Sequence, residues 1–235
     1  MNFIFTDEQI QFKDAIKAFL NDECTPESIR SGWDKKQSFN QDRWNGLQDM
    51  GVLSVNLSED KGGLGMDQVA LALMVEEMGY VGLPEPVAEQ TFLVNDLLPM
   101  LPAAMQEKIQ DFLISEISYI SVVHSLAPNP MFLNESAGLL IFEKNSYKFV
   151  LKHDVEFEEV ASNDPSRELS KIISTQNHIS SSENFELLNS AIASRGALMT
   201  AALLIGLSQK MIDLSSSYAL DRTQFGKPIG SFQAV

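Results

Sequence analysis

The residues best suited to bind a ligand lie near the C-terminal end of the sequence. Arg222 carries a permanent charge and a planar fork of N–H donors, which suits a pyrophosphate. Phe225 offers a flat apolar face on which an adenine ring could stack, and the Gln233 amide can both donate and accept hydrogen bonds. The competing interpretation is that Arg222 pairs with Asp221 or another surface carboxylate and that Phe225 belongs to a core. The residues by themselves leave both interpretations open.

Other kinds of chemistry are limited by the residue types that the sequence provides. Cys24 is the only cysteine, which excludes an internal disulfide and a multi-cysteine metal site. The three histidines, His124, His153 and His178, are not three or four residues apart in any pair. We therefore expect them to be surface or core residues, and we predict no metal site.

Charge and composition narrow the range of partners. The sequence holds 17 basic and 32 acidic side chains, which gives a net charge of −15. Such a surface would repel the phosphates of nucleic acids and of anionic membranes, so we expect neither as a partner. A hydrophobic content of 44% is that of a globular protein. No apolar run is expected to span a bilayer, and residues 1–8 contain no secretory signal. We therefore predict a cytoplasmic protein without membrane insertion.

The elements that position these residues fall into three parts, and the first, residues 1–115, is predicted to be helical. Thr6 and Gln9 form a capping box that opens a helix ending near Pro26. Asn40 is expected to cap a second helix. Three further helices follow the glycine-rich loop 58–65: from about Asp67 to Met78 with Gly79 as the stop, from about Val87 to Leu98, and after Pro102.

The second part, residues 116–179, changes from helical to strand periodicity. Runs rich in β-branched and aromatic residues, separated by turn formers, lie at 119–123, 138–142 and 147–151. The turn at 144–146 predicts a hairpin between the last two runs. We expect a small antiparallel β domain.

The third part, residues 180–235, is dominated by one long helix. Ser180 and Glu183 predict a capping box at its start, and no proline interrupts the pattern up to about Leu220. Apolar side chains recur at helical spacing at Leu188, Ile192, Leu198, Ala202, Ile205 and Ile212. A small β domain cannot cover the apolar positions of a helix this long. We therefore expect the helix to pack in a bundle, between subunits or both.

Two motifs and the order of the three parts resemble the acyl-CoA dehydrogenase family. Residues 59–65 are similar to the family's P-E-x-x-G-G-x-G loop, with Ser58 where proline is usual. Residues 218–234 are similar to its Y-x-x-x-R-x-x-F-G-x-x-I-x-x-x-Q pattern. The resemblance implies an α+β fold that is mainly α. This fold has an N-terminal helical bundle, a small antiparallel β domain and the start of a C-terminal helical bundle.

The resemblance also implies an activity, a cofactor and an assembly. Members of the family are FAD-dependent enzymes that carry out α,β-dehydrogenation of acyl-CoA thioesters. In the family, the residues of the tail pattern touch an FAD that is bound mainly by the neighbouring subunit. This implies a homo-oligomer or a heteromer with another acyl-CoA dehydrogenase subunit, and an acyl-CoA substrate. The cofactor-binding residues implied in this chain are Arg222, Gln224, Phe225, Phe232 and Gln233.

The sequence departs from the family pattern in the predicted β domain. Members carry a T-E-P-x-A-G-S-like segment and a later W-I-T-like segment, which hydrogen-bond the flavin ring and its phosphates. Neither is found between residues 116 and 175, and the domain is short. We expect the deletion to fall on its flavin-facing side.

The catalytic base of the family is also missing from its expected positions. Removal of the proton α to the thioester needs a poised carboxylate. In most members this glutamate lies beyond the position where this sequence ends. Members that place it on the long helix would have it at Gly196, and the nearby Arg195 cannot replace it. A helix arginine common in the family falls at Ala197. No catalytic residue is therefore predicted in this chain.

Three hypotheses remain at this stage. The chain is an acyl-CoA dehydrogenase whose activity another chain completes, or a non-catalytic assembly subunit, or a truncated product. In the second case the chain lends Arg222 and Phe225 to the flavin of a neighbouring subunit or only supports that subunit.

Overall fold

The computed structural model describes residues 4–115 and 119–232. The N-terminal part is helical, and the short α5 continues directly into a π-helical turn at Leu93–Leu97 and a 3-10 turn at Leu98–Met100. The helices are α1 (Asp7–Glu23), α2 (Pro26–Lys35), α3 (Gln41–Asp49), α4 (Gln68–Val81), α5 (Val87–Phe92) and α6 (Ala103–Ser115).

The strands form a mixed sheet and two small hairpins. The four-stranded sheet has the order β1-β2-β3-β6, β4 pairs with β5, and β7 pairs with β8. The strands are β1 (Tyr119–Val123), β2 (Ser136–Phe142), β3 (Tyr147–Leu151), β4 (Val155–Val160), β5 (Leu169–Thr175), β6 (His178–Ser181), β7 (Thr223–Gln224) and β8 (Lys227–Pro228). The third part of the chain is α7 (Phe185–Asp221), followed by the β7–β8 hairpin.

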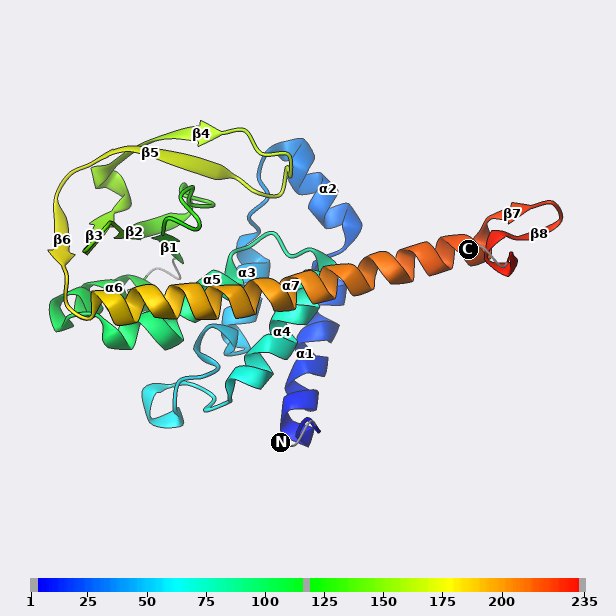
Figure 1. The fold of residues 1–235 in the computed structure, drawn as a ribbon, viewed down its shortest axis with the longest axis horizontal. Helices are drawn as coiled ribbons and strands as arrows, with labels where there is room; N and C mark the ends of the chain where they lie inside the picture. The colour runs from blue at the N-terminus through cyan, green and yellow to red at the C-terminus, as the bar shows by residue number, and fades with distance from the viewer. Residues whose placement is uncertain (1–3, 116–118, 233–235) are drawn as a thin grey trace.

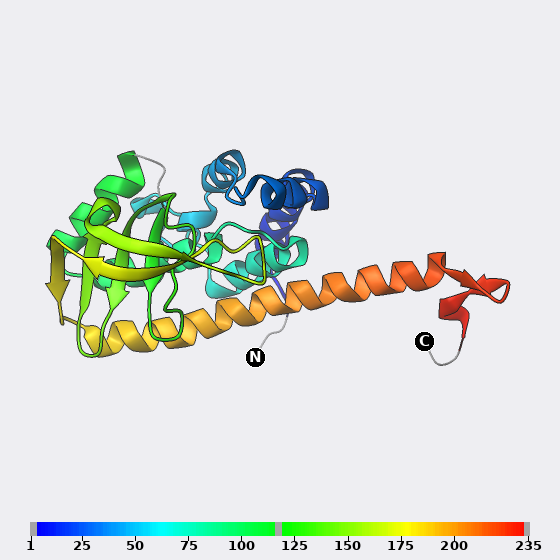
Figure 2. The same ribbon diagram turned by 90° about the horizontal axis from the view of Figure 1, so that it is seen from above.

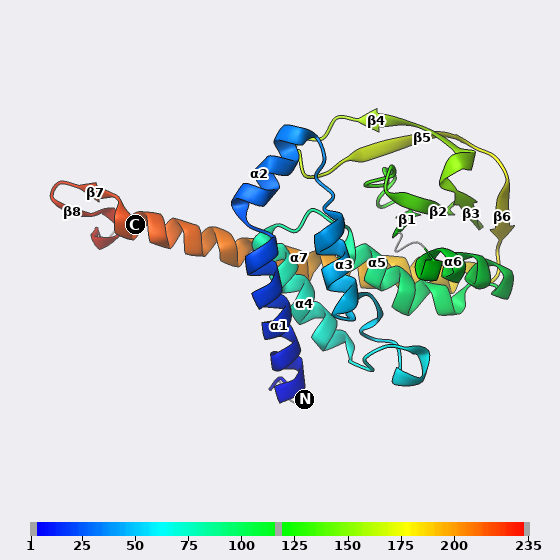
Figure 3. The same ribbon diagram turned by 180° about the vertical axis from the view of Figure 1, so that it is seen from behind.

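The β region is arranged in layers. Figures 1 and 3 show β4 and β5 on one side of the four-stranded sheet and α6 and α7 on the other. One apolar cluster fills the space between the two sheets, and a larger one joins the other face to the helices. A third cluster, with fully buried Trp44, holds α1, α3 and α4 together. The core is therefore continuous along the first half of α7.

Helix α7 passes along the whole body and extends beyond it. Figures 1 and 2 show its second half carrying the β7–β8 hairpin away from the other elements. Its crossing with α4 is close because two glycines lie there. A Cβ added at Gly206 would lie 1.8 Å from the Glu76 carbonyl oxygen, and one at Gly79 would lie 2.1 Å from the Leu203 carbonyl oxygen. The fold thus fixes α7 against α4 through backbone contact.

Much of the predicted architecture is confirmed, including the fold class. The capping box of Thr6 and Gln9, the Asn40 cap and the hairpin at 144–146 are all present. One pairing differs from the expected antiparallel pattern, because β1 and β2 are parallel. A long connection, residues 124–135, brings the chain back so that both strands run in the same direction. The division at residues 115 and 179 stays a prediction.

One predicted helix end is wrong, and two other predicted helices differ in detail. The helix expected to stop at Gly79 continues to Val81 and ends at Gly82, whose φ of 70° suits a residue without a Cβ. Pro26 follows the end of α1 as predicted, and it is also the first residue of a further helix, α2, which Thr25 caps. The helix expected over Val87–Leu98 consists of an α-helical, a π-helical and a 3-10 segment in succession.

The start of the long helix also differs from the prediction. Ser180 lies in β6, where it pairs with Lys148, so it is not available to cap a helix. The helix begins at Phe185, after Asn184 with a φ of 53°. The capping box predicted from Ser180 and Glu183 is therefore wrong, because pairing with β3 keeps this segment extended.

Among the described residues, one helix, α7, is long and apolar enough to cross a membrane by length and composition, contrary to the expectation from the sequence. Such a helix is weak evidence for a membrane span, because interior helices of other proteins have the same length and composition. The first half of α7 packs against the sheet, and Leu203 and Gly206 near its middle contact the α4 backbone. This part of α7 therefore belongs to the core of the chain.

Candidate functional site

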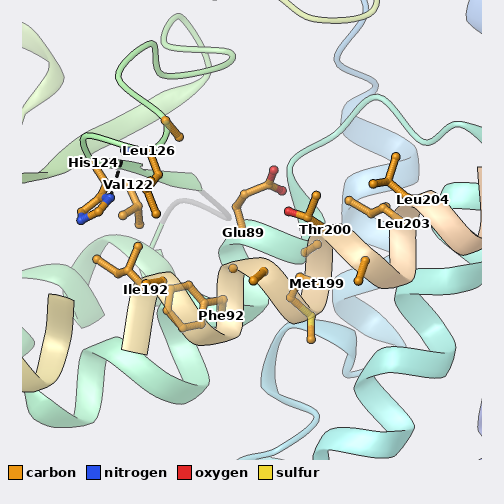
Figure 4. A pocket seen from close by; sticks show the side chains of 16 residues that line it. Glu89, Phe92, Val122, His124, Leu126, Ile192, Met199, Thr200, Leu203 and Leu204 are labelled. Atoms are coloured by element: carbon orange, nitrogen blue, oxygen red, sulfur yellow. Dashed lines mark hydrogen bonds between the residues drawn. The ribbon is translucent and has the colours of Figure 1, made fainter. Parts of the chain in front are cut away.

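A pocket of about 530 Å³ lies between α5, the segment after β1 and α7. Figure 4 shows the side chains around it. Most of the residues that line it are apolar: Ala88 and Phe92 from α5, Val122, Leu126 and Ala127 at and after β1, and Ile192, Ala193, Ala197, Met199, Ala201, Leu203 and Leu204 from α7. The polar side chains in its wall are Glu89, His124 and Thr200.

The pocket walls are fixed by side chains that lie behind them. Fully buried Gln90 accepts a hydrogen bond from the backbone N–H of Ile120 at 3.0 Å, which joins α5 to the first strand. Thr91, also fully buried, donates to the Val87 carbonyl at 2.8 Å. Because the Gln90 contact fixes α5 against β1, Glu89, which precedes Gln90 and lines the pocket, keeps a defined position.

His124 connects the end of β1 to α7. Its Nδ1 accepts a hydrogen bond from the Leu126 backbone N–H at 3.1 Å, so the proton of a neutral ring lies on Nε2. Nε2 is 2.8 Å from Asn189 Oδ1 and donates to it. Both ring nitrogens therefore have partners within the chain. The residue holds the turn at the pocket rim and has no free nitrogen for chemistry.

Glu89 is the one acidic residue in the pocket wall. Burial raises the pKa of its carboxyl, and the charge of Arg167 opposes this shift. Arg167 itself contacts Asp164 and Met131. Within the part of the chain that the structure describes, the Glu89 carboxylate forms no ion pair and no hydrogen bond to another side chain. It accepts a hydrogen bond from its own backbone N–H, and the residue is partly exposed. In Figure 4 it points toward Thr200 of α7.

The structure places Gly196 in the wall of this pocket, together with Ala197. A Cβ added at Gly196 would meet nothing within 4 Å, so the backbone faces open space. The neighbouring Arg195 lies 3.5 Å from Asp96 and is not among the pocket residues. The long helix thus presents no carboxylate to the pocket at the position where some members of the family carry one.

The residues predicted to bind a cofactor lie in the tail, the segment of the sequence from residue 222 onward. Arg222 ends α7, donates to the Tyr218 hydroxyl and has its guanidinium carbon 5.6 Å from the Tyr218 ring centroid. Gln224 is exposed in β7. The predicted alternative pairing of Arg222 with Asp221 does not occur among the ion pairs of the described residues. Gln233 lies outside the described residues.

Two aromatic rings accompany these polar groups. Phe225 is 94% exposed and has a φ of 54°, so it belongs to no core within this chain. Its ring centroid is 6.3 Å from that of Phe232, at 87°. Lys227 places its Nζ 4.3 Å above the Phe232 ring. The tail therefore brings together two cations and two aromatic faces.

These features fit part of an FAD molecule. The tail cations and exposed rings suit its phosphates and adenine. No lysine or arginine is among the described residues that line the pocket, so the pocket fits an apolar or flat uncharged group and not a phosphate. Figures 1 and 2 show the tail at the far end of α7, away from the pocket elements. A single chain does not bring the two regions together.

Sequence reasoning missed Glu89, His124 and the pocket itself. A signal for Glu89 was present, because it is the lone acid between Val87 and Leu93 in a segment that is otherwise uncharged. A single acid in an apolar helix is a candidate for a buried functional group. The partners of His124 come from α7, which is too far along the chain for spacing to indicate.

A helical region, a small β layer and a long helix around an apolar pocket define the acyl-CoA dehydrogenase fold. Residues 6–117 match the family described as "Acyl-CoA dehydrogenase, N-terminal domain", and residues 185–235 match "Acyl-CoA dehydrogenase, C-terminal domain". The chain therefore belongs to the acyl-CoA dehydrogenase family, as the sequence motifs predicted.

Curated relatives agree with this assignment. Acyl-CoA dehydrogenase IpdE2 from Mycobacterium tuberculosis is 25% identical over 233 residues, which cover 97% of this chain and 69% of the relative. Acyl-CoA dehydrogenase FadE34 from the same organism is 28% identical over 211 residues, which cover 83% of this chain and 29% of the relative.

Solved structures show the same fold at low identity. The prolyl acyl carrier protein oxidase AnaB is 16% identical with a TM-score of 0.80, covering 98% of this chain and 74% of that one. The ChsE4-ChsE5 complex from Mycobacterium tuberculosis is 17% identical with a TM-score of 0.79, covering 100% of this chain and 72% of its match.

Proposed function

We propose that the chain is a subunit of an FAD-dependent acyl-CoA dehydrogenase and that a second subunit completes its active site. The observation that carries this proposal is the separation between the tail and the pocket. The second half of α7 and the β7–β8 hairpin form an arm that extends beyond the body of the chain. Arg222 and Phe225 lie on this arm, where they suit a cofactor held mainly by a neighbouring subunit. The pocket beside α7 is the part of the chain that suits an acyl group.

The reaction removes a proton from the α-carbon and a hydride from the β-carbon of the acyl group, leaving a double bond between them. Bound FAD would accept the hydride. The residues of this chain have other tasks: the apolar wall holds the acyl group and excludes water, and Arg222 stabilises negative charge on the cofactor. Because Gly196 supplies no carboxylate, we propose that the proton acceptor belongs to the second subunit.

A non-catalytic assembly subunit is the second candidate, favoured by the open space at Gly196. Both candidates predict that the isolated chain does not reduce an artificial electron acceptor with any acyl-CoA. They differ in the activity expected when the second subunit is added. Addition of the second subunit restores turnover that depends on residues of this chain if the first candidate is right. The ChsE4-ChsE5 complex, which has the same fold, is also an assembly of two unlike chains.

The cofactor prediction is tested at Arg222 by titrating FAD and following the quenching of its fluorescence. A charge-assisted contact is worth about 1.5–3 kcal/mol, so Arg222→Ala should weaken FAD binding by about 10-fold to 100-fold. Arg222→Lys should recover only part of the loss, because an ammonium cannot make the two-pronged contact. The fold should remain intact, since the residue follows the last turn of α7.

Arg30→Ala is the matched control, because Arg30 is an exposed arginine on α2, far from the tail. The titrations are made with the chain alone and with any partner that co-purifies. Equal affinities for the wild type, both Arg222 variants and the control would return Arg222 to the role of a surface residue. If FAD binds neither to the chain alone nor to the chain with its partner, the flavoprotein proposal is contradicted.

A further inference from the structure

The pocket contains a charged group that the proposed dehydrogenation does not use. Glu89 is the one ionisable acid in a wall that is otherwise mostly apolar, and α7 supplies no second carboxylate there. Glu89 is partly exposed, so water reaches its carboxylate in the open pocket, and the carboxylate also accepts from its own backbone N–H. An acyl group made only of hydrocarbon would displace this water and leave the charge with the backbone contact alone, which is costly in an apolar environment. This makes Glu89 the feature of the pocket that calls for a ligand.

No side chain among the described residues can replace the water at this carboxylate. Arg167, whose charge acts on it, is engaged with Asp164 and Met131. His124, the other ionisable residue in the wall, has both ring nitrogens occupied by Leu126 and Asn189. The polar group that replaces the displaced water therefore has to come from the molecule that fills the pocket.

The space beside Glu89 is shaped by small residues. Ala193, Gly196, Ala197 and Ala201 of α7 line the pocket, and a Cβ at Gly196 would still meet nothing within 4 Å. Thr200 lies among them, and the Glu89 carboxylate points toward it in Figure 4. No hydrogen bond of the Thr200 hydroxyl occurs among those of the residues that the structure describes.

We propose that the pocket selects acyl groups that carry a hydroxyl, with Glu89 and Thr200 as the residues that recognise it. This inference rests on the proposed function. A hydroxyl both donates and accepts hydrogen bonds, so it can donate to the Glu89 carboxylate and accept from the Thr200 hydroxyl. An ammonium could donate to both side chains, but it would have to lose the hydration shell of a charged group in a mostly apolar pocket. The hydroxyl therefore suits this pair of side chains better than a cation does.

The test compares the binding of CoA thioesters by calorimetry, using the protein as isolated with any co-purifying partner. The probes are octanoyl-CoA, its forms with one hydroxyl on each carbon beyond the β-carbon, and the corresponding amino forms. We expect one hydroxylated form to bind about 10-fold to 100-fold more tightly than octanoyl-CoA, as for a hydrogen bond to a charged group. Glu89→Leu should remove this preference, and Thr200→Val should reduce it.

Two controls separate recognition from folding. Glu89→Gln keeps the shape and the acceptor oxygen but removes the charge, so it should lose about 10-fold of the preference and retain octanoyl-CoA binding. Glu107→Leu changes an exposed glutamate on α6 that does not line the pocket, and should leave the preference unchanged. Thermal unfolding of each variant, compared with that of the wild type, confirms that the fold is intact.

The outcomes distinguish this inference from the proposed function. Equal affinity for octanoyl-CoA and all of its hydroxylated forms would overturn the selection of a hydroxyl while leaving acyl-CoA binding in place. Tighter binding of an amino form would overturn the choice of a hydroxyl over a cation. If no CoA thioester binds, both the inference and the assignment of this pocket to the acyl group fail, whereas FAD binding is measured separately through Arg222.

Discussion

At the scale of single residues, the interior near α3 holds a thiol beside a buried ion pair. Arg43 and Glu85 are almost fully buried, and Arg43 Nη2 lies 2.5 Å from Glu85 Oε1. Glu85 also accepts from the Asn40 backbone N–H at 2.7 Å, so the pair is well satisfied. Cys24 is buried close to these charges. Burial raises the pKa of its thiol to about 11, with Arg43 lowering and Glu85 raising it by smaller amounts.

The raised pKa of Cys24 predicts a pH dependence of stability. The folded state keeps its thiol proton up to about pH 11, whereas the unfolded state releases it near 9.0. Because the unfolded chain then binds fewer protons, the free energy of unfolding falls as pH rises through this window. Relative to Cys24→Ala, the wild type should lose about 1.4 kcal/mol between about pH 7 and about pH 10.

Urea denaturation of the wild type and Cys24→Ala at several pH values measures this difference. The comparison cancels the titration of lysines and tyrosines that both proteins share. A difference that does not change with pH would mean that the Cys24 thiol titrates normally in the folded state and is accessible to water.

At the scale of elements, the sequence correctly predicts the helix caps that depend on contacts between residues close together in the chain. The Thr6 and Asn40 caps are correct because each side chain bonds to a backbone N–H three residues ahead. The sequence predicts a helix stop at Gly79, but its lack of a Cβ allows close contact with α7, which is distant in sequence. Ser180 matched a cap pattern, but pairing with β3 decided its conformation. Tertiary contact overrode the local signal at both positions.

The crossing of α4 and α7 predicts opposite effects at two glycines of the same helix. Gly196→Ala adds a methyl group to open space and should stabilise the protein by about 0.5–1 kcal/mol through helix propensity. Gly206→Ala places a methyl group against the Glu76 carbonyl oxygen and should destabilise it by about 1–3 kcal/mol, because α4 and α7 have to move apart.

Free energies of unfolding from urea denaturation test this pair, and each glycine is the control for the other. The propensity gain is common to both sites, so the difference between the variants reports the packing of α7 on α4. If Gly206→Ala is as stable as Gly196→Ala, the two helices are farther apart than the structure places them.

At the scale of the whole molecule, the chain is a layered body with an arm. The tail could be predicted because its pattern lies in one short stretch, 218–234. The pocket could not, because its walls come from residues 88–92, 122–127 and 192–204, which only the fold brings together. The tail and the pocket also lie apart in space, so neither region makes a complete site within one chain (Figure 2).

The arm determines the expected state of assembly. The second half of α7 exposes a row of large apolar side chains that nothing else among the described residues covers: Leu204, Ile205, Leu207, Met211, Ile212, Leu214, Tyr218 and Leu220. An apolar surface of this length is typical of a contact between proteins and not of a monomer. We therefore predict that the isolated chain forms a homodimer or a larger oligomer at micromolar concentration.

Light scattering measures the mass, and a value of 26.1 kDa for the wild type would contradict the prediction. Ile212→Lys should shift the protein toward the monomer, because it places a charge in the middle of the apolar row, where Ile212 is 58% exposed. The control is Ile173→Lys, where the side chain is 48% exposed on β5, a strand that Figure 1 shows away from the second half of α7. That variant should keep the mass of the wild type. Dissociation by Ile212→Lys alone would locate the contact on the arm that carries Arg222, so that assembly and cofactor binding involve the same end of α7.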